Sequence, residues 1–225
     1  MESHQTGSAF LRDIIIGLSD GLTVPFALAA GLSGVVADTG IVITAGLAEI
    51  AAGSIAMGLG GFLAGQTEQE HYDAEFRREQ EEIERVPEVE KAEVRAVLAD
   101  YGISEPLQIA VADEMAQHPD KWVDFMMRFE LGLEKPDIHR AKKSAANIGL
   151  SYAVGGFVPL APYFFAETPQ RALIYSAFIT LLTLTIFGYF KSKATGQPPL
   201  SGALKVTAIG TVAAAAAYFI GRAVA

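Results

Sequence analysis

Two pairs of glutamates in the middle of the chain have a spacing that suits a metal ion. The pairs are Glu79-x-x-Glu82 and Glu90-x-x-Glu93. Residues three apart are neighbours on a helix, and like charges at that spacing are destabilising unless a cation neutralises them. Pro87 lies between the pairs and permits a turn that would bring both to one site. The pattern predicts a site for a cation.

A second group of candidate ligands lies downstream. Met126, Met127 and Glu130 place two thioethers and a carboxylate on adjacent turns of an expected helix. Oxygen ligands alone would suit magnesium or calcium, whereas thioether sulfur shifts the expectation to a first-row transition ion. An alternative remains open for the whole set. Glutamate-rich helices are usually solvated, with salt bridges to neighbours such as Arg77, Arg78 and Arg85.

Three more candidates lie inside long apolar runs: Asp20, Glu49 and Met57. A charged side chain near mid-bilayer costs about 2.5–3.5 kcal/mol, so a carboxylate there indicates a function. Helix geometry puts Glu49, Gly53 and Met57 on one face, with Asp20 level with Met57 on the neighbouring helix and Glu49 roughly 12 Å deeper. We expect these residues to line an ion path. Local pairing of Asp20 and ordinary packing of Met57 are the alternatives.

The elements that would position these residues are helices. Five segments approach the roughly 20 residues that a bilayer span requires, and the fold class expected is an all-α polytopic membrane protein. The spans are Ile14–Ala37, Ile41–Ala64, Ser144–Ala166, Ala172–Phe190 and Val206–Gly221. Residues 1–66 would hold the first two transmembrane helices, 67–137 a helical metal-binding domain, and 138–225 the last three transmembrane helices.

Charge separates the inserted domain from the spans. Residues 67–137 contain 20 of the 26 acidic residues and 8 of the 17 basic ones, a formal charge of −12. The lysines and arginines beside the spans lie mostly on one side, which puts the N-terminus and the acidic domain in the cytosol and the C-terminus across the membrane. Within the domain we expect four helices and a small shared core of Val94, Leu98, Ile109, Trp122, Phe125 and Phe129.

Several classes of function are disfavoured. The chain has no cysteine, which removes disulfides, zinc–thiolate sites and iron–sulfur clusters. It has no recognisable nucleophile–base pair or cofactor loop, so we expect neither an enzyme nor a bound prosthetic group. Nucleic acid is not an expected partner.

The motifs together resemble one family. "RDIIIGLSDGLTVPFALAAGLSG", "AGLAEIAAGSIAMGLGGFLAG", the paired glutamates, "MMRFELGLE" and "GGFVPLAPYFF" are similar to the vacuolar iron transporter family over nearly the whole chain. The resemblance implies a five-span homodimer in the vacuolar membrane that exports cytosolic Fe(II) into the vacuole in exchange for protons. It implies a path along the dimer interface and metal collection by the cytosolic helices.

The family's roles fall on the residues already named. Asp20, Glu49 and Met57 would line the path, and Glu79, Glu82, Glu90, Glu93, Met126, Met127 and Glu130 would bind metal. Fe(II) is the expected substrate ion, and manganese-transporting relatives leave Mn(II) open. Two other functions remain possible from the sequence: a membrane-anchored metal sensor or buffer, and a passive channel for divalent cations.

Overall fold

The computed structural model describes residues 4–224, with side chains from residue 9 onward, and all regular structure in that range is helical. The α-helices are α1 (His4–Ser33), α2 (Thr39–Arg85), α3 (Pro87–Asp100), α4 (Glu105–Met115), α5 (Pro119–Phe125), α6 (Arg140–Leu160), α7 (Pro169–Ala194) and α8 (Pro199–Val224). A π-helical turn, Met126–Glu130, follows α5, and a 3-10 turn, Ala161–Phe164, follows α6.

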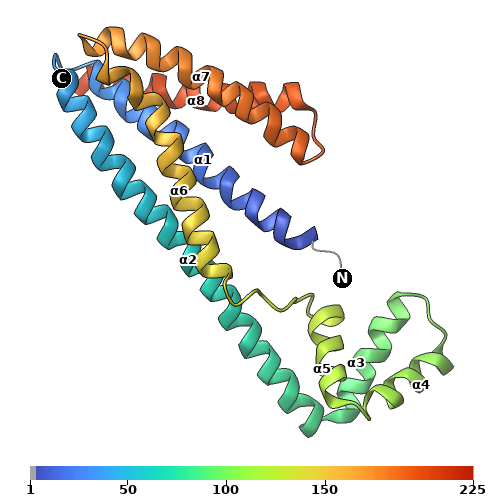
Figure 1. The fold of residues 1–225 in the computed structure, drawn as a ribbon. Coiled ribbons are helices and arrows are strands. Elements are labelled where there is room, and N and C mark those ends of the chain that lie inside the picture. The colour runs from blue at the N-terminus through green and yellow to red at the C-terminus, as the bar shows by residue number, and fades with distance from the viewer. Residues whose placement is uncertain (1–3, 225) are drawn as a thin grey trace. The chain divides into compact units, whose positions relative to one another are not determined.

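The chain forms two compact units (Figure 1). The first, called the apolar unit here, combines Met1–Leu63 with Ala141–Ala225. The second, the acidic unit, is Ala64–Arg140. Helix α2 contributes its first part to the apolar unit and its remainder to the acidic unit.

Four helices of the described chain are long and apolar enough to cross a membrane: α1 from Ala9, α2, α7 and α8. The predicted span Ser144–Ala166 corresponds to α6 and the 3-10 turn after it, and α6 is not among these four. It begins with Arg140, Lys142 and Lys143 and contains several small or polar residues, which lower its mean hydropathy. Its α-helical part also ends at Leu160, because Pro162 cannot donate the next backbone hydrogen bond.

Helix α6 packs between α1 and α2 through glycines (Figure 1). Gly17 and Gly21 of α1 lie against the carbonyl oxygens of Ile148 and Tyr152, where any Cβ would collide. On the other side, a Cβ at Gly58 of α2 would be 3.0 Å from the Ala145 carbonyl oxygen. The Gly17-x-x-x-Gly21 pattern therefore serves helix packing within this chain.

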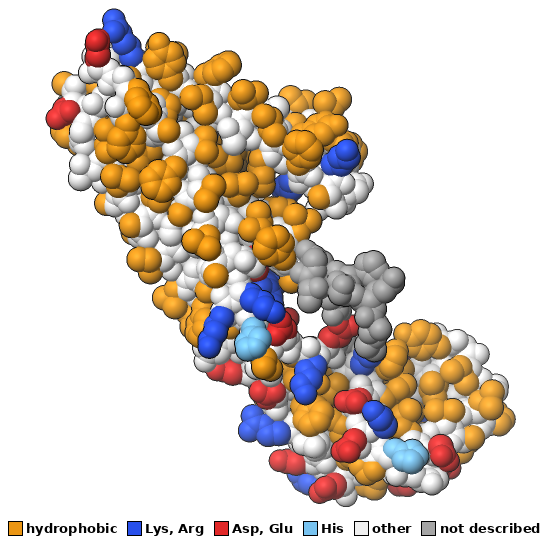
Figure 2. Space-filling model, viewed as in Figure 1, with side chains coloured by type: hydrophobic (Ala, Val, Ile, Leu, Met, Phe, Trp, Pro, Cys, Tyr) orange, Lys and Arg blue, Asp and Glu red, His pale blue; other side chains and the backbone are white. Residues whose placement is uncertain are grey.

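The last two helices close the apolar unit. Helix α7 packs on α8 where Gly188 meets Gly202, and α1 packs on α8 where Gly31 meets Ala217. Buried Phe26, Ala30 and Ala214 fill the space between these helices. Large apolar side chains cover the outside of the unit, as Figure 2 shows for one face. Such a surface suits lipid rather than water.

The acidic unit has its own core. Val94, Leu98, Ala112, Trp122 and Met126 form one cluster, and Tyr72, Val123 and Met127 form another. Two residues of the predicted core are exposed instead, Ile109 by 42% and Phe129 by 47%. Pro87 begins α3, and Gly102 and Gly132 take positive φ after α3 and after the π-helical turn.

Candidate functional site

The glutamates of the acidic unit have unequal environments. Glu79 on α2 is 2% exposed and Glu90 on α3 is 3% exposed, which is rare for an acidic side chain. Their pair partners, Glu82 and Glu93, are only partly buried. Pro87 begins α3, whose first buried position, Glu90, is close enough to Glu79 to interact with it electrostatically. Both pairs therefore direct one carboxylate inward.

Five carboxylates act on one another electrostatically, and we call them the carboxylate cluster. They are Glu79, Glu82, Glu90, Glu93 and Glu130. Burial raises the pKa of Glu79 to about 7, and the carboxylates of Glu130, Glu82 and Glu93 add to the increase. Burial and the same neighbours also raise the pKa of Glu90 to about 7. The glutamates whose spacing predicted a common site thus influence one another's pKa values, and their binding of a metal ion stays a prediction.

Two oxygens of the cluster are available to a ligand. Glu79 Oε2 and Glu90 Oε2 are buried and have no hydrogen-bond partner among the described residues. An unpartnered buried oxygen is costly unless a proton or a cation neutralises it. No group of three His, Cys, Asp or Glu side chains between residues 9 and 224 is close enough to enclose a metal ion as the side chains stand. Coordination by several of them therefore requires side-chain movement.

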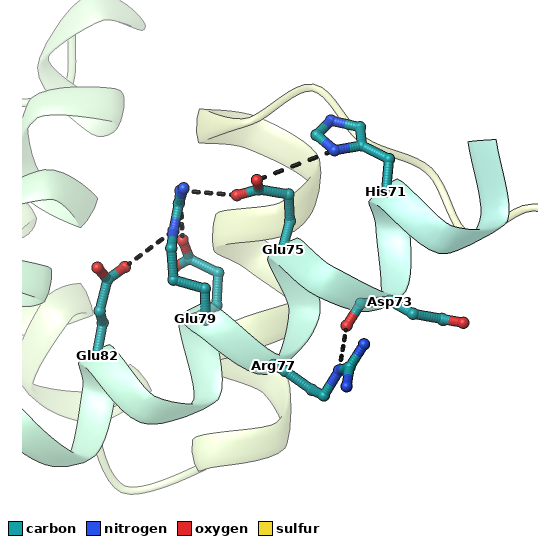
Figure 3. A network of polar contacts seen from close by, with 7 residues as sticks. His71, Asp73, Glu75, Arg77, Glu79 and Glu82 are labelled. Carbon is teal, nitrogen blue, oxygen red and sulfur yellow. Dashed lines mark hydrogen bonds and ion pairs between the residues drawn. The ribbon is translucent and has the colours of Figure 1, made fainter. Parts of the chain in front are cut away.

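Arg78 is the counterion of three glutamates that Figure 3 labels on α2, Glu75, Glu79 and Glu82. Its Nη2 lies 2.8 Å from Glu75 Oε2 and 3.7 Å from Glu79 Oε1, and its Nε lies 3.5 Å from Glu82 Oε2. The arginine lowers the pKa of Glu79 against the effect of burial. Arg77 points elsewhere and donates to the Asp73 carbonyl oxygen at 3.0 Å. The salt bridge that the solvated-face alternative expects is thus present between Arg78 and Glu82, but that alternative does not account for buried Glu79 and Glu90.

Met126 and Met127 lie in the core of the acidic unit. They are 0% and 1% exposed, and each belongs to a different apolar cluster. The π-helical turn that contains them also contains Glu130. Such turns are uncommon and are frequent at functional sites. The thioethers are therefore packed side chains in this conformation, and their role as ligands stays a prediction.

In the apolar unit, Glu49 has a partner that its sequence position did not predict. The hydroxyl of Tyr152, on α6, donates a hydrogen bond to Glu49 Oε1 on α2. Glu49 Oε2 is buried and has no partner among the described residues. Asp20, on α1, is close enough to Tyr152 to interact with it electrostatically. The available signal was a tyrosine inside an apolar run, but nothing local indicated which helix it would face.

A second missed residue is Asp13, which is 1% exposed near the start of the first apolar run. Ser144 Oγ donates to its Oδ1 at 3.2 Å, and Asn147 Nδ2 to its Oδ2 at 3.4 Å. These contacts tie α1 to α6. Asp20 and Met57 themselves are half-buried on α1 and α2.

Comparisons with known proteins point to one group. A family model described as "VIT family" matches residues 11–222. A protein named "Vacuolar iron transporter 1" from Arabidopsis thaliana is 53% identical over 99% of this chain and 89% of its own length. Its namesake from Tulipa gesneriana is 52% identical over 99% and 90%. "Protein CCC1" from Saccharomyces cerevisiae is 40% identical over 93% and 67%.

Proposed function

The chain belongs to the VIT family, and from this we propose that it transports Fe(II) from the cytosol into a vacuole in exchange for protons. The names of the similar proteins support iron as the cargo and the vacuole as the destination. The observation that most supports transport is Glu49, a carboxylate on an apolar helix with one oxygen that has no partner among the described residues. A protein that only anchors a metal-binding domain has no need of such a group.

We propose that α6 is a fifth transmembrane helix. It packs by glycine contacts between α1 and α2, both of which are long and apolar enough to cross a membrane. Because its backbone contacts α1 and α2 directly, α6 would lie at the same depth in the membrane as these two helices. With five crossings, most of the lysines and arginines next to the spans lie on one side. The N-terminus and the acidic unit are then cytosolic and the C-terminus is luminal.

The carboxylate cluster would collect the ion. Its five glutamates concentrate negative charge, and such a field raises the local concentration of cations. Bound Fe(II) would replace the protons of Glu79 and Glu90, whose pKa values are close to cytosolic pH. Met126 and Met127 would add sulfur ligands that favour a transition ion over magnesium.

The ion would then pass Asp20 and Met57 to reach Glu49. In a low-dielectric path a bare carboxylate is unfavourable, so Glu49 would hold either the metal ion or a proton. Alternation between the two couples metal movement to proton movement in the opposite direction. We propose that a homodimer forms the path at its interface, as the family resemblance implies, and that Mn(II) is a second substrate.

Uptake by proteoliposomes tests this function. Fe(II) uptake by the wild-type protein should require a pH gradient, and Glu49→Gln should abolish it, because the neutral amide can neither release a proton nor balance a cation. Glu167→Gln is the matched control, since Glu167 is exposed and pairs only with nearby Arg171 among the interactions described. Parallel assays with Mn(II) and Zn(II) give the selectivity.

The same assay separates the alternatives. Metal binding to the protein without flux in liposomes would indicate a sensor or buffer. Flux that persists without a pH gradient would indicate a passive channel. Undiminished, gradient-dependent uptake by Glu49→Gln would contradict the mechanism proposed for that residue.

A further inference from the structure

Tyr152 occupies a position that its packing defines closely. Its side chain is 2% exposed, and its hydroxyl reaches across from α6 to Glu49 Oε1 on α2. Its backbone lies against Gly21 of α1, where even a methyl group would collide with the Tyr152 carbonyl. Tyr152 is thus held at both ends: its backbone contacts α1, and its hydroxyl is hydrogen-bonded to α2.

Gly53 provides the space for the phenol ring. A Cβ at Gly53 would lie 2.5 Å from Cε1, Cζ and the hydroxyl oxygen of Tyr152. The ring therefore rests directly on the backbone of α2. Gly53 is four residues, about one helical turn, after Glu49, so the phenol and the carboxylate meet on the same face of α2. A side chain at position 53 would displace the hydroxyl from the carboxylate.

The hydrogen bond makes the two oxygens of Glu49 unequal. Oε1 accepts from the tyrosine, whereas Oε2 is buried and has no partner among residues 9–224. A glutamate without this bond would distribute over several rotamers, and ordering them on ion binding would cost free energy. Hydrogen-bonded partners that orient a ligand in advance typically change metal affinity by 10–100-fold.

We propose that Tyr152 is a positioning residue for the transported cation. Its hydroxyl holds Oε1 of Glu49 so that Oε2 alone is presented to the ion, and Gly53 makes this arrangement possible. The inference rests on the proposed function and adds to it a residue that touches the carboxylate rather than the ion. It also gives Gly53 a role distinct from helix packing, because its neighbour is a side-chain hydroxyl and not a backbone.

Kinetics of uptake by proteoliposomes test the inference. Tyr152→Phe keeps the ring and removes only the hydroxyl, so the apparent KM for Fe(II) should rise about 10–100-fold while the maximal rate stays within about twofold. Gly53→Ala should raise KM in the same direction by displacing the ring. Gly60→Ala is the matched control on the same helix, because a Cβ there has no atom within 4 Å, and its KM should equal that of the wild type.

The outcomes separate this inference from the proposed function. If the wild type transports iron and Tyr152→Phe has a wild-type KM, the positioning role is wrong and the transport function stands. A fall in maximal rate at unchanged KM also overturns the role, because the hydroxyl would then act in a step other than ion binding. If the wild type itself shows no uptake, both proposals fail. The thermal midpoint of Tyr152→Phe in detergent should match the wild type, which excludes misfolding as the cause.

Discussion

Glu79 and Glu90 lie on consecutive helices, and each has a buried carboxylate oxygen without a partner in the described chain and a pKa raised to about 7. Burial is the largest cause in both, and the carboxylate of Glu79 contributes to the shift at Glu90. Near neutral pH the two groups therefore exchange protons readily. A cation that binds there must compete with protons.

We predict that metal affinity depends on pH between 6 and 8. Binding of Mn(II) to the full-length protein in detergent should tighten as pH rises, because the protons on Glu79 and Glu90 no longer compete with the metal. Below pH 7 the affinity should change by up to about tenfold per pH unit for each proton displaced. Calorimetry in buffers with different ionisation enthalpies counts the protons released.

Single substitutions identify the glutamates that release those protons. Glu79→Gln should reduce both the affinity and the number of protons released. Glu81→Gln, at an exposed position two residues away on α2, should change neither. Equal proton release by the wild type and Glu79→Gln would show that Glu79 does not exchange its proton for metal.

The stability of the metal-free protein should fall as pH rises. The pKa values of Glu79 and Glu90 are raised from 4.5 to about 7, so the stability they contribute is complete below about pH 4.5 and is lost as pH rises through about 7. Glutamine resembles the protonated acid. Glu90→Gln should therefore raise the free energy of unfolding by about 1–3 kcal/mol at pH 8 and leave it nearly unchanged at pH 5.

Thermal unfolding of the full-length protein measures this difference. Saturating Mn(II) should make the wild type more stable than Glu90→Gln at pH 8, because the metal stabilises only a protein that binds it. A stability difference between Glu90→Gln and the wild type that is the same at pH 5 and pH 8 would contradict the prediction.

Arg78 should compete with the metal for the carboxylates. It pairs with Glu75, Glu79 and Glu82, but its side chain is 51% exposed, so each pair is weak. Arg78→Gln should raise metal affinity at pH 8 by roughly three- to tenfold. It should also lower the stability of the metal-free protein, because the repulsion within the cluster is no longer offset.

Arg77→Gln is the control for that experiment. Arg77 is adjacent and exposed, and its Nε donates a hydrogen bond to a backbone carbonyl oxygen rather than to a carboxylate. Titration with Mn(II) should therefore give wild-type affinity for this variant. Lower affinity of Arg78→Gln at pH 8 would mean that the arginine orders the glutamates and does not compete with the metal.

Sequence patterns predicted the local parts of the acidic site and not its tertiary parts. Helix periodicity and Pro87 placed the two glutamate pairs on consecutive helices, because both depend only on neighbours along the chain. Which member of each pair is buried depends on the packing of α3 against α2, and the sequence could not distinguish Glu79 from Glu82. Ile109 and Phe129 were wrongly assigned to the core for the same reason, since apolar character alone does not identify the buried face.

The same difference between local and tertiary features applies to Glu49 and its partner in the apolar unit. Glu49 could be identified from the sequence because it is a carboxylate inside an apolar run, and this requires no information about its neighbours in space. Its partner Tyr152 is 103 residues away, and the pairing depends on how α6 lies between α1 and α2. The glycines that set this packing were visible in the sequence. Their partners were not, because small residues indicate a close contact without saying which helix makes it.

The buried methionines allow a test that separates packing from ligation. Met126 and Met127 fill two apolar clusters, and methionine-to-leucine changes conserve volume and cost less than about 1.5 kcal/mol. The double variant Met126→Leu, Met127→Leu should therefore stay folded, with a thermal midpoint close to that of the wild type. If the thioethers bind metal, the variant should lose preference for a transition ion such as Co(II) over Mg(II), because only oxygen ligands remain. Competition between the two ions for the full-length protein measures this preference. An unchanged preference in the folded variant would show that the methionines serve the core alone and that the carboxylate cluster binds the ion without sulfur.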